Sequence, residues 1–247
     1  MAESTVIEGE LAGRTALVTG GTAGIGLATA RRLVDAGAFV VVTGRNRERG
    51  EHAQGELGPH ARFVAVDMAD PAGVDRLSRD LELDILVNNA ARFPAALTVD
   101  QDESDFGHTF ATNVRGLYFL VAATVPAMIR RGGGAIVNIT SMVASKGVPG
   151  ASVYSASKAA VEQLTRTWAV EFGAHNIRVN NVAPGPTATD GVVTEWGETN
   201  DELGRALPLG RTADPAEIAE AIYFLASPSA SFITGTTLHV DGGGTAV

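Results

Sequence analysis

The sequence predicts an α/β fold, namely a doubly wound parallel sheet of seven strands with helices on both faces. Two observations carry this prediction. Short apolar runs alternate with segments of helical periodicity along the chain, and such alternation is typical of a parallel sheet covered on both sides. The length of 247 residues suits one large domain, 1–247, that needs no disulfide or metal for stability.

The composition excludes several classes of function. There is no cysteine, which removes thiolate metal sites and a cysteine nucleophile. The histidines show no ligand spacing, so no metal is expected. The net charge of −9 argues against nucleic acid or anionic membrane as partners. No apolar run approaches about 20 residues, and the first residues, MAESTVIEGE, lack the pattern of a signal peptide. We therefore expect a soluble cytoplasmic protein.

The apolar runs define the expected strands, and right-handed crossovers place their carboxyl ends along one edge of the sheet. Open α/β sheets bind their ligands at that edge. Candidate polar and glycine residues follow most of these runs directly, so we expect one site there. In chain order, the expected strands are 15–18, 39–42, 62–66, 84–87, 135–139, 177–182 and 237–240.

The first strand breaks into the glycine-rich stretch TGGTAGIG, and a helical pattern follows. A strand, a glycine turn and a helix form the context that a phosphate-binding loop needs. The glycines allow close approach of the backbone, and the helix N-terminus offers free N–H groups. A loop that merely joins a strand to a helix is the alternative. The candidate cofactor-binding residues here are Gly20, Thr22, Gly24, Ile25 and Gly26.

The end of the second strand bears on which dinucleotide would bind. An acid at this position binds the 2′-hydroxyl of the adenosine ribose, whereas an arginine accommodates a 2′-phosphate. Gly44 leaves the acid position empty and Arg45 follows it, which favours NADP over NAD. Ala23 offers no second basic group in the glycine loop, and exposed arginines also occur on solvated faces.

Three further polar sites lie along the chain. Asp67, followed by Met68, ends the third strand and can accept from an adenine amino group or simply shape a turn. Asn89 and Ala90 follow the fourth strand, where the backbone can lie close to a cofactor or form an ordinary turn. Asn113 falls within an apolar helical stretch at 103–131. A buried amide there must be hydrogen-bonded, so it either bends the helix or belongs to a polar site.

Tyr154 and Lys158 are four residues apart, which puts them on one face of a predicted helix at 154–172. An ammonium beside a phenol favours the phenolate and so lowers the pKa of a tyrosine from about 10. Ser141 ends the fifth strand, where it can hydrogen-bond an oxygen in front of the tyrosine. Lys146 and Lys158 are the only lysines, and an arginine could not relay a proton. A solvated Tyr–Lys pair is the alternative.

The segment 186–209 follows the sixth strand and has no clear periodicity, as expected of a substrate lid or of disorder. Together with three stretches elsewhere it would line a mostly apolar substrate pocket, which favours a hydrophobic carbonyl compound. Those stretches are 92–94, 142–144 and 148–153, and Trp196 lies in the lid.

Taken together, these motifs resemble the short-chain dehydrogenase/reductase family over about Leu11 to Gly243, in its shorter branch with 3-oxoacyl reductases and carbonyl reductases. The family's glycine motif appears as TGGTAGIG, its serine in ITS and its Tyr-x-x-x-Lys as YSASK. Its asparagine appears in NVRG. Its Asn-Asn-Ala-Gly reads NNAA, so Ala91 departs from the usual glycine. The resemblance implies a Rossmann-like fold.

The resemblance also implies roles for the site residues. Tyr154 would transfer a proton to or from the substrate oxygen, and Ser141 would polarise that oxygen. Lys158 would lower the pKa of the tyrosine and hold the nicotinamide ribose, and Asn113 would anchor a water in the proton path. The nicotinamide would be contacted by Pro184, Gly185, Thr187 and Thr189.

The function implied is an NAD(P)-dependent oxidoreductase acting on a ketone, an aldehyde or a secondary alcohol. Members of the family are mostly homotetramers or dimers built through two long helices, so a homo-oligomer is expected. The alternative is a catalytically silent dinucleotide-binding sensor or scaffold. Such a protein would be expected to lose the tyrosine or the lysine, and both are present.

Overall fold

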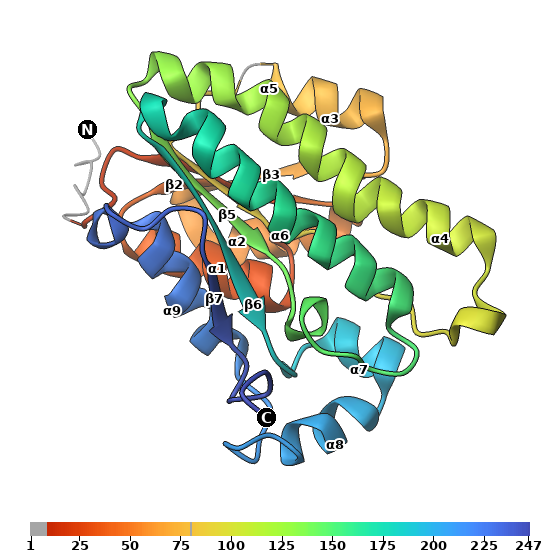
Figure 1. Ribbon diagram of the computed structural model, residues 1–247. Helices are drawn as coiled ribbons and strands as arrows, with labels where there is room; N and C mark the ends of the chain where they lie inside the picture. Colours follow the sequence, from red (N-terminus) through yellow and green to blue (C-terminus); the bar gives the residue numbers. More distant parts are fainter. Residues whose placement is uncertain (1–8, 80) are drawn as a thin grey trace.

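A computed structural model describes residues 9–79 and 81–247. Within them, seven strands form one parallel sheet in the order β3-β2-β1-β4-β5-β6-β7 (Figure 1). The doubly wound α/β fold expected from the sequence is confirmed, with strand ends shifted by no more than two residues. The strands are β1 (Thr15–Val18), β2 (Phe39–Gly44), β3 (Ala61–Ala65), β4 (Ile85–Asn88), β5 (Gly134–Ile139), β6 (Ile177–Pro184) and β7 (Thr237–Val240).

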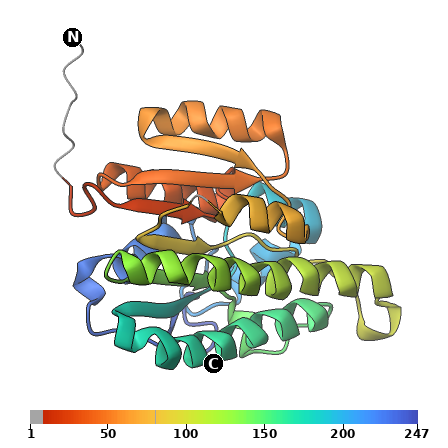
Figure 2. The ribbon, with the colours of Figure 1, turned by 90° about the horizontal axis from the view of Figure 1, so that it is seen from above.

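Helices cover both faces of this sheet and bury one apolar core on each side (Figures 1 and 2). One core lies beneath α1, α2 and α9, and the other lies beneath α3, α5 and α6. The helices are α1 (Gly24–Asp35), α2 (Arg47–Leu57), α3 (Pro71–Ser78), α4 (Glu103–Phe110), α5 (Leu117–Arg130), α6 (Ser152–Phe172), α7 (Asp190–Trp196), α8 (Thr199–Arg205) and α9 (Pro215–Ala226).

The helical stretch expected at 103–131 is interrupted by a π-helical segment, η3 (Ala111–Gly116), between α4 and α5. Such segments insert an extra residue per turn and are frequent at functional sites. As one run, Glu103–Arg130 is long and apolar enough to cross a membrane by length and composition alone. However, 56% of its most apolar window is buried inside the protein, as in the core helix of a soluble protein. Asp105 and Arg115 interrupt the apolar residues of this helical stretch, so no apolar run of that length was expected from the sequence.

The segment 186–209 carries more regular structure than its sequence indicates, because it contains the short helices α7 and α8. Tertiary hydrogen bonds contribute to this order. Thr189 Oγ1 accepts from Val192 N at 3.3 Å at the start of α7, and the buried Asn200 donates to Thr187 O at 3.3 Å. The side chain of Trp196 and the first eight residues, on which expectations were stated above, lie outside the described residues.

A buried polar row crosses four strands beneath α6. Asn88, Asn138, Asn181 and Thr237 are direct neighbours in register on β4, β5, β6 and β7. Asn88 donates to Asn138 at 2.8 Å, and Asn181 donates to Thr237 at 3.0 Å. Thr165 of α6 joins the two halves, accepting from Asn138 at 2.7 Å and donating to Asn181 at 2.6 Å. The row therefore fixes α6 against the strands whose tips carry the candidate site.

Candidate active site

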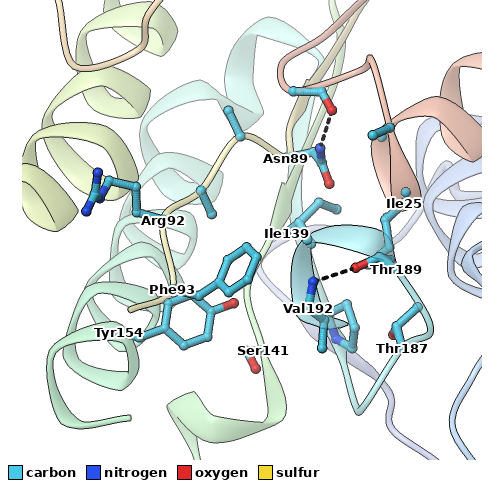
Figure 3. Close-up of a pocket in the computed structure, with 18 of the residues that line it drawn as sticks. Ile25, Asn89, Arg92, Phe93, Ile139, Ser141, Tyr154, Thr187, Thr189 and Val192 are labelled. Atoms are coloured by element: carbon cyan, nitrogen blue, oxygen red, sulfur yellow. Dashed lines mark hydrogen bonds between the residues drawn. The ribbon is translucent and has the colours of Figure 1, made fainter. Parts of the chain in front are cut away.

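A cavity of about 820 Å³ opens at the carboxyl edge of the sheet, within the size range of small-molecule and cofactor sites (Figure 3). It is lined by all the expected catalytic and cofactor-binding residues except Asn113, which lies behind it. They come from the ends of β1 to β6, from α6 and from the segment before α7. Their lining members are Gly20, Thr22, Gly24, Ile25, Gly26, Arg45, Asp67, Met68, Asn89, Ala90, Ser141, Tyr154, Lys158, Pro184, Gly185, Thr187 and Thr189. The three stretches expected to line a substrate pocket contribute only Arg92, Phe93, Met142, Val143, Val148 and Ala151.

Tyr154 and Ser141 meet at the floor of this cavity. Tyr154 lies in the first turn of α6 and Ser141 directly follows Thr140 at the tip of β5. Figure 3 shows Phe93 and Ser141 on either side of the tyrosine hydroxyl, and the Phe93 ring lies 6.2 Å from the Tyr154 ring. Burial raises the pKa of Tyr154 to about 12, although its hydrogen bond with Ser141 lowers it in part. The phenol is therefore protonated at neutral pH and can donate.

Lys158 lies one turn further along α6 and is 2% exposed. Its Nζ donates to Ile139 O at 2.7 Å and lies 5.5 Å from the centre of the Tyr154 ring. Burial lowers the pKa of Lys158 to about 7. The expectation that this lysine lowers the pKa of Tyr154 is wrong for the structure as it stands. Burial acts on both groups, and it disfavours the ammonium that was to stabilise the phenolate.

Asn113 lies in η3 and reaches the segment that follows β4. Its Oδ1 accepts from Arg92 N and its Nδ2 donates to Arg92 O, both at 2.8 Å. The same Nδ2 donates to Ser157 Oγ at 3.0 Å, next to Lys158. The sequence left open whether Asn113 bends the helix or belongs to a polar site, and both hold. The asparagine lies in the π-helical segment, and its hydrogen bonds connect it to Arg92 and Ser157 at the site.

The glycine loop is shaped by hydrogen bonds that the sequence alone could not assign. Asn89 Nδ2 donates to Thr19 O at 3.0 Å and to Gly20 O at 3.1 Å. In return, Thr19 Oγ1 accepts from Asn89 N and Ala90 N at 3.0 and 3.1 Å. Thr19 was therefore missed as a site residue, although it stands first in the motif. A methyl group placed on Gly26 would lie 2.2 Å from Gly20 O, so a glycine is required there.

The N-terminus of α1 fits a phosphate group. No side chain caps this helix end, and its first turn carries no acid that would compete with an anion. The first N–H groups of a helix have no partner within it and attract negative charge. Because Gly24, Ile25 and Gly26 of this turn line the cavity, the residues present suit the pyrophosphate of a dinucleotide.

At the end of the cavity away from Tyr154, Arg45 lies just before α2 and Arg49 lies in its first turn. Arg49 was missed from the sequence because it follows the strand end by a full helical turn. A methyl group placed on Gly44 would lie 2.8 Å from Thr22 Cγ2 and 2.9 Å from Thr22 Oγ1. Position 44, where an acid would bind the ribose 2′-hydroxyl, therefore has no room for a side chain next to Thr22. Asp67 accepts from Ala69 N at 2.9 Å, which matches the turn role considered for it.

The segment after β6 closes the cavity on its remaining side. Thr187 is buried and donates to Gly185 O at 2.9 Å, and Thr189 lies beside Gly24 of the glycine loop. Thr140, Asn200 and several apolar residues also line the cavity, although none of them was named individually as a candidate. Thr140 was recognisable from its place before Ser141, whereas Asn200 depends on the packing of α8.

Comparisons with known proteins agree with this geometry. The family model described as enoyl-(acyl carrier protein) reductase matches residues 20–245. A sorbitol dehydrogenase of Cereibacter sphaeroides is 38% identical, and the match covers 94% of this chain and 98% of the relative. A 3-oxoacyl-[acyl-carrier-protein] reductase of Chlamydia trachomatis serovar D is 36% identical over 96% of this chain and 99% of the relative.

A solved structure described as a short chain dehydrogenase/reductase family protein is 56% identical and superposes with a TM-score of 0.93. That similarity covers 96% of this chain and the whole of the solved one. The glycine, serine and Tyr-x-x-x-Lys motifs of this chain lie around one cavity. The chain therefore belongs to the short-chain dehydrogenase/reductase family of oxidoreductases.

Proposed function

We propose that the protein is an NADP-dependent oxidoreductase that transfers a hydride between nicotinamide and a ketone, an aldehyde or a secondary alcohol, with Tyr154 as general acid and base. The observation that carries the proposal is the hydrogen-bonded pair of Tyr154 and Ser141 in the cavity that the uncapped end of α1 also lines. A sorbitol dehydrogenase and a 3-oxoacyl reductase among the relatives support chemistry at a hydroxyl or carbonyl carbon.

The protein's own residues account for the proton transfer. A nicotinamide held by the glycine loop and by Thr187 and Thr189 would supply or accept the hydride. Tyr154, protonated at neutral pH, donates its proton to the substrate oxygen, which Ser141 holds and polarises. Lys158, with a pKa of about 7, can both hold and release a proton at neutral pH, which suits replacement of the proton that leaves the tyrosine. In this scheme Asn113 anchors the water that continues the path behind Lys158.

NADP is the proposed cofactor, with NAD as the weaker alternative. Arg45 and Arg49 line the end of the cavity where an adenosine ribose would lie. Positive charges at a helix N-terminus oppose the helix dipole, so a bound anion accounts for their position better than helix stability does. The proposed cofactor contacts are otherwise those expected from the sequence, including Asp67 and Met68 at the adenine and Thr187 and Thr189 at the nicotinamide.

The substrate is proposed to be an apolar carbonyl compound or the matching alcohol, as for a 3-oxoacyl-type or broad carbonyl reductase. The wall beyond Tyr154 is formed by apolar side chains, and we infer that the segment 186–209 acts as its lid on a single domain spanning 1–247. The apolar lining consists of Phe93, Met142, Val143, Val148, Val192 and Leu203.

We also infer a homo-oligomer, a tetramer or else a dimer, located in the cytoplasm. An apolar groove lies between α6 and the run formed by α4, η3 and the start of α5, and it includes the exposed Phe119 and the half-buried Phe110 and Leu164. Exposed aromatic side chains of this kind mark protein interfaces. The resemblance to the family implies assembly through two long helices.

The test is turnover with each cofactor. Absorbance of the reduced nicotinamide is followed with acetophenone, cyclohexanone, fructose and an acetoacetyl thioester, using NADPH and NADH in parallel. Activity with NADPH is expected on at least one apolar ketone. The Tyr154→Phe variant should lose at least about a hundredfold in kcat while binding NADPH normally. A wild-type protein that binds NADPH without any turnover would instead support the sensor or scaffold.

A further inference from the structure

A compact turn, Asp241–Thr245, follows β7 and reads DGGGT. Its aspartate organises it: the carboxylate accepts from Gly243 N at 3.0 Å, from Thr245 N at 2.8 Å and from Thr245 Oγ1 at 2.6 Å. Asp241 is 7% exposed, so these bonds are largely shielded from water. These hydrogen bonds hold the turn in one conformation, so the segments that pack against it are fixed in position.

Two substrate-facing segments pack against this turn. From the lid side, Leu209 N donates to Gly242 O at 3.1 Å. From the side of the catalytic serine, Lys146 Nζ donates to Gly244 O at 2.7 Å. A methyl group placed on Gly244 would lie 2.9 Å from both Leu207 Cδ2 and Met142 Sδ. The end of the lid, at Leu207, and the serine loop, defined as 141–151, thus meet at Gly244.

The serine loop forms one wall of the substrate end of the cavity, through Val143, Val148 and Ala151. The lid forms the facing wall through Val192 and Leu203. Since both walls are attached to the 241–245 turn, the distance between them depends on these attachments. Lys146 supplies a charged hydrogen bond to a backbone carbonyl, which is stronger than a neutral one.

We propose that Lys146 is a positioning residue for the reaction, tying the serine loop to the 241–245 turn and thereby setting the width of the substrate end of the cavity. Lys146 does not line the cavity. It acts through Met142, which is buried against the turn and directly follows Ser141. This proposal rests on the proposed function for its kinetic consequence, but the attachment itself can be measured separately.

The test compares Lys146→Met, which keeps the apolar stem and removes the donor, with Lys146→Arg, which keeps a donor. With NADPH and the ketone found active in the wild type, Lys146→Met should raise KM about fivefold to tenfold. Its Kd for NADPH should stay within about twofold of wild type, and Lys146→Arg should recover most of the loss. The control is Arg62→Met, an exposed cation on β3 at the opposite edge of the sheet from β7.

Amide hydrogen exchange provides the second readout. Lys146→Met should speed exchange in peptides covering 142–151 and 241–247, and the control should not. Unchanged KM together with unchanged exchange overturns the proposal, and so does an equal change of both in Arg62→Met. If the wild type turns over no ketone, aldehyde or secondary alcohol, the proposed function fails, and the exchange result alone then decides whether Lys146 ties the loop to the turn.

Discussion

Tyr154 and Lys158 share one physical circumstance, which is burial in the same wall of the cavity. Burial disfavours the charged form of each group, so it raises the pKa of Tyr154 to about 12 and lowers that of Lys158 to about 7. A neutral phenol carries the proton that carbonyl reduction requires. The lysine, titrating near neutral pH, can resupply the proton without a large energetic cost.

The buried lysine predicts a specific dependence of stability on pH. Unfolded, Lys158 regains a pKa of 10.5, whereas folded it titrates at about 7. Between these values the unfolded chain binds more protons, so the free energy of unfolding should rise with pH, by at most about 1.4 kcal/mol per unit. Urea unfolding from about pH 7.5 to about pH 9.5 should show this rise in the wild type and a smaller one in Lys158→Met. An equal rise of the unfolding free energy with pH in both proteins would contradict the lowered pKa of Lys158.

The contact between Thr22 and Gly44 predicts how cofactor preference can be changed. An aspartate at position 44 would bind a ribose 2′-hydroxyl, but Thr22 blocks its side chain. Gly44→Asp alone should therefore weaken both cofactors. Combined with Thr22→Ala, it should favour NADH over NADPH by about tenfold. Fluorescence titration of both nucleotides measures this, and equally tight NADH binding by the single variant would show that Thr22 is no obstacle.

Among the secondary-structure elements, the strands were the most predictable from sequence. The five inner strands are short, buried apolar runs, and the edge strands β3 and β7 are short runs that are only partly buried. Runs of this kind can be recognised from the sequence alone. Once the strands were predicted, the residues at their carboxyl ends could be predicted as site residues. Ser141, Asn89 and Arg45 are examples. The helices α7 and α8 could not be predicted, because tertiary bonds such as that of Asn200 help to hold them. The roles of Thr19 and Arg49 likewise depend on contacts distant in sequence or a helical turn away.

The π-helical segment η3 carries Asn113, whose side chain binds both backbone groups of Arg92. Replacing Asn113 by Ala leaves Arg92 N and Arg92 O without their partner. Each buried group left unpaired costs about 1–3 kcal/mol. We expect a comparable loss in the free energy of unfolding by urea denaturation, together with a fall in kcat of at least about tenfold. Asn113→Asp keeps an acceptor for Arg92 N, so it should lose less stability. A variant as stable and active as wild type would contradict the role of η3.

For the molecule as a whole, the apolar groove between α6 and the α4–η3–α5 run predicts association. Phe119 is 57% exposed on this face. Phe119→Glu would place a charge in the interface and should lower the molar mass found by light scattering to that of a smaller assembly. Val99→Glu, at a position 89% exposed and outside the groove, is the matched control and should leave the molar mass unchanged. A wild-type protein that is already monomeric would refute the interface.

The buried row of Asn88, Asn138, Asn181 and Thr237 has a consequence for how this sequence can change over time. Each amide satisfies a neighbour on another strand or Thr165 on α6. Replacing one member leaves a partner unpaired, while replacing two together by apolar side chains can be nearly neutral. Mutations along the row should therefore be epistatic, and a viable path away from this pattern runs through paired substitutions. The polar residues of these four strands should therefore be retained or replaced together in related sequences.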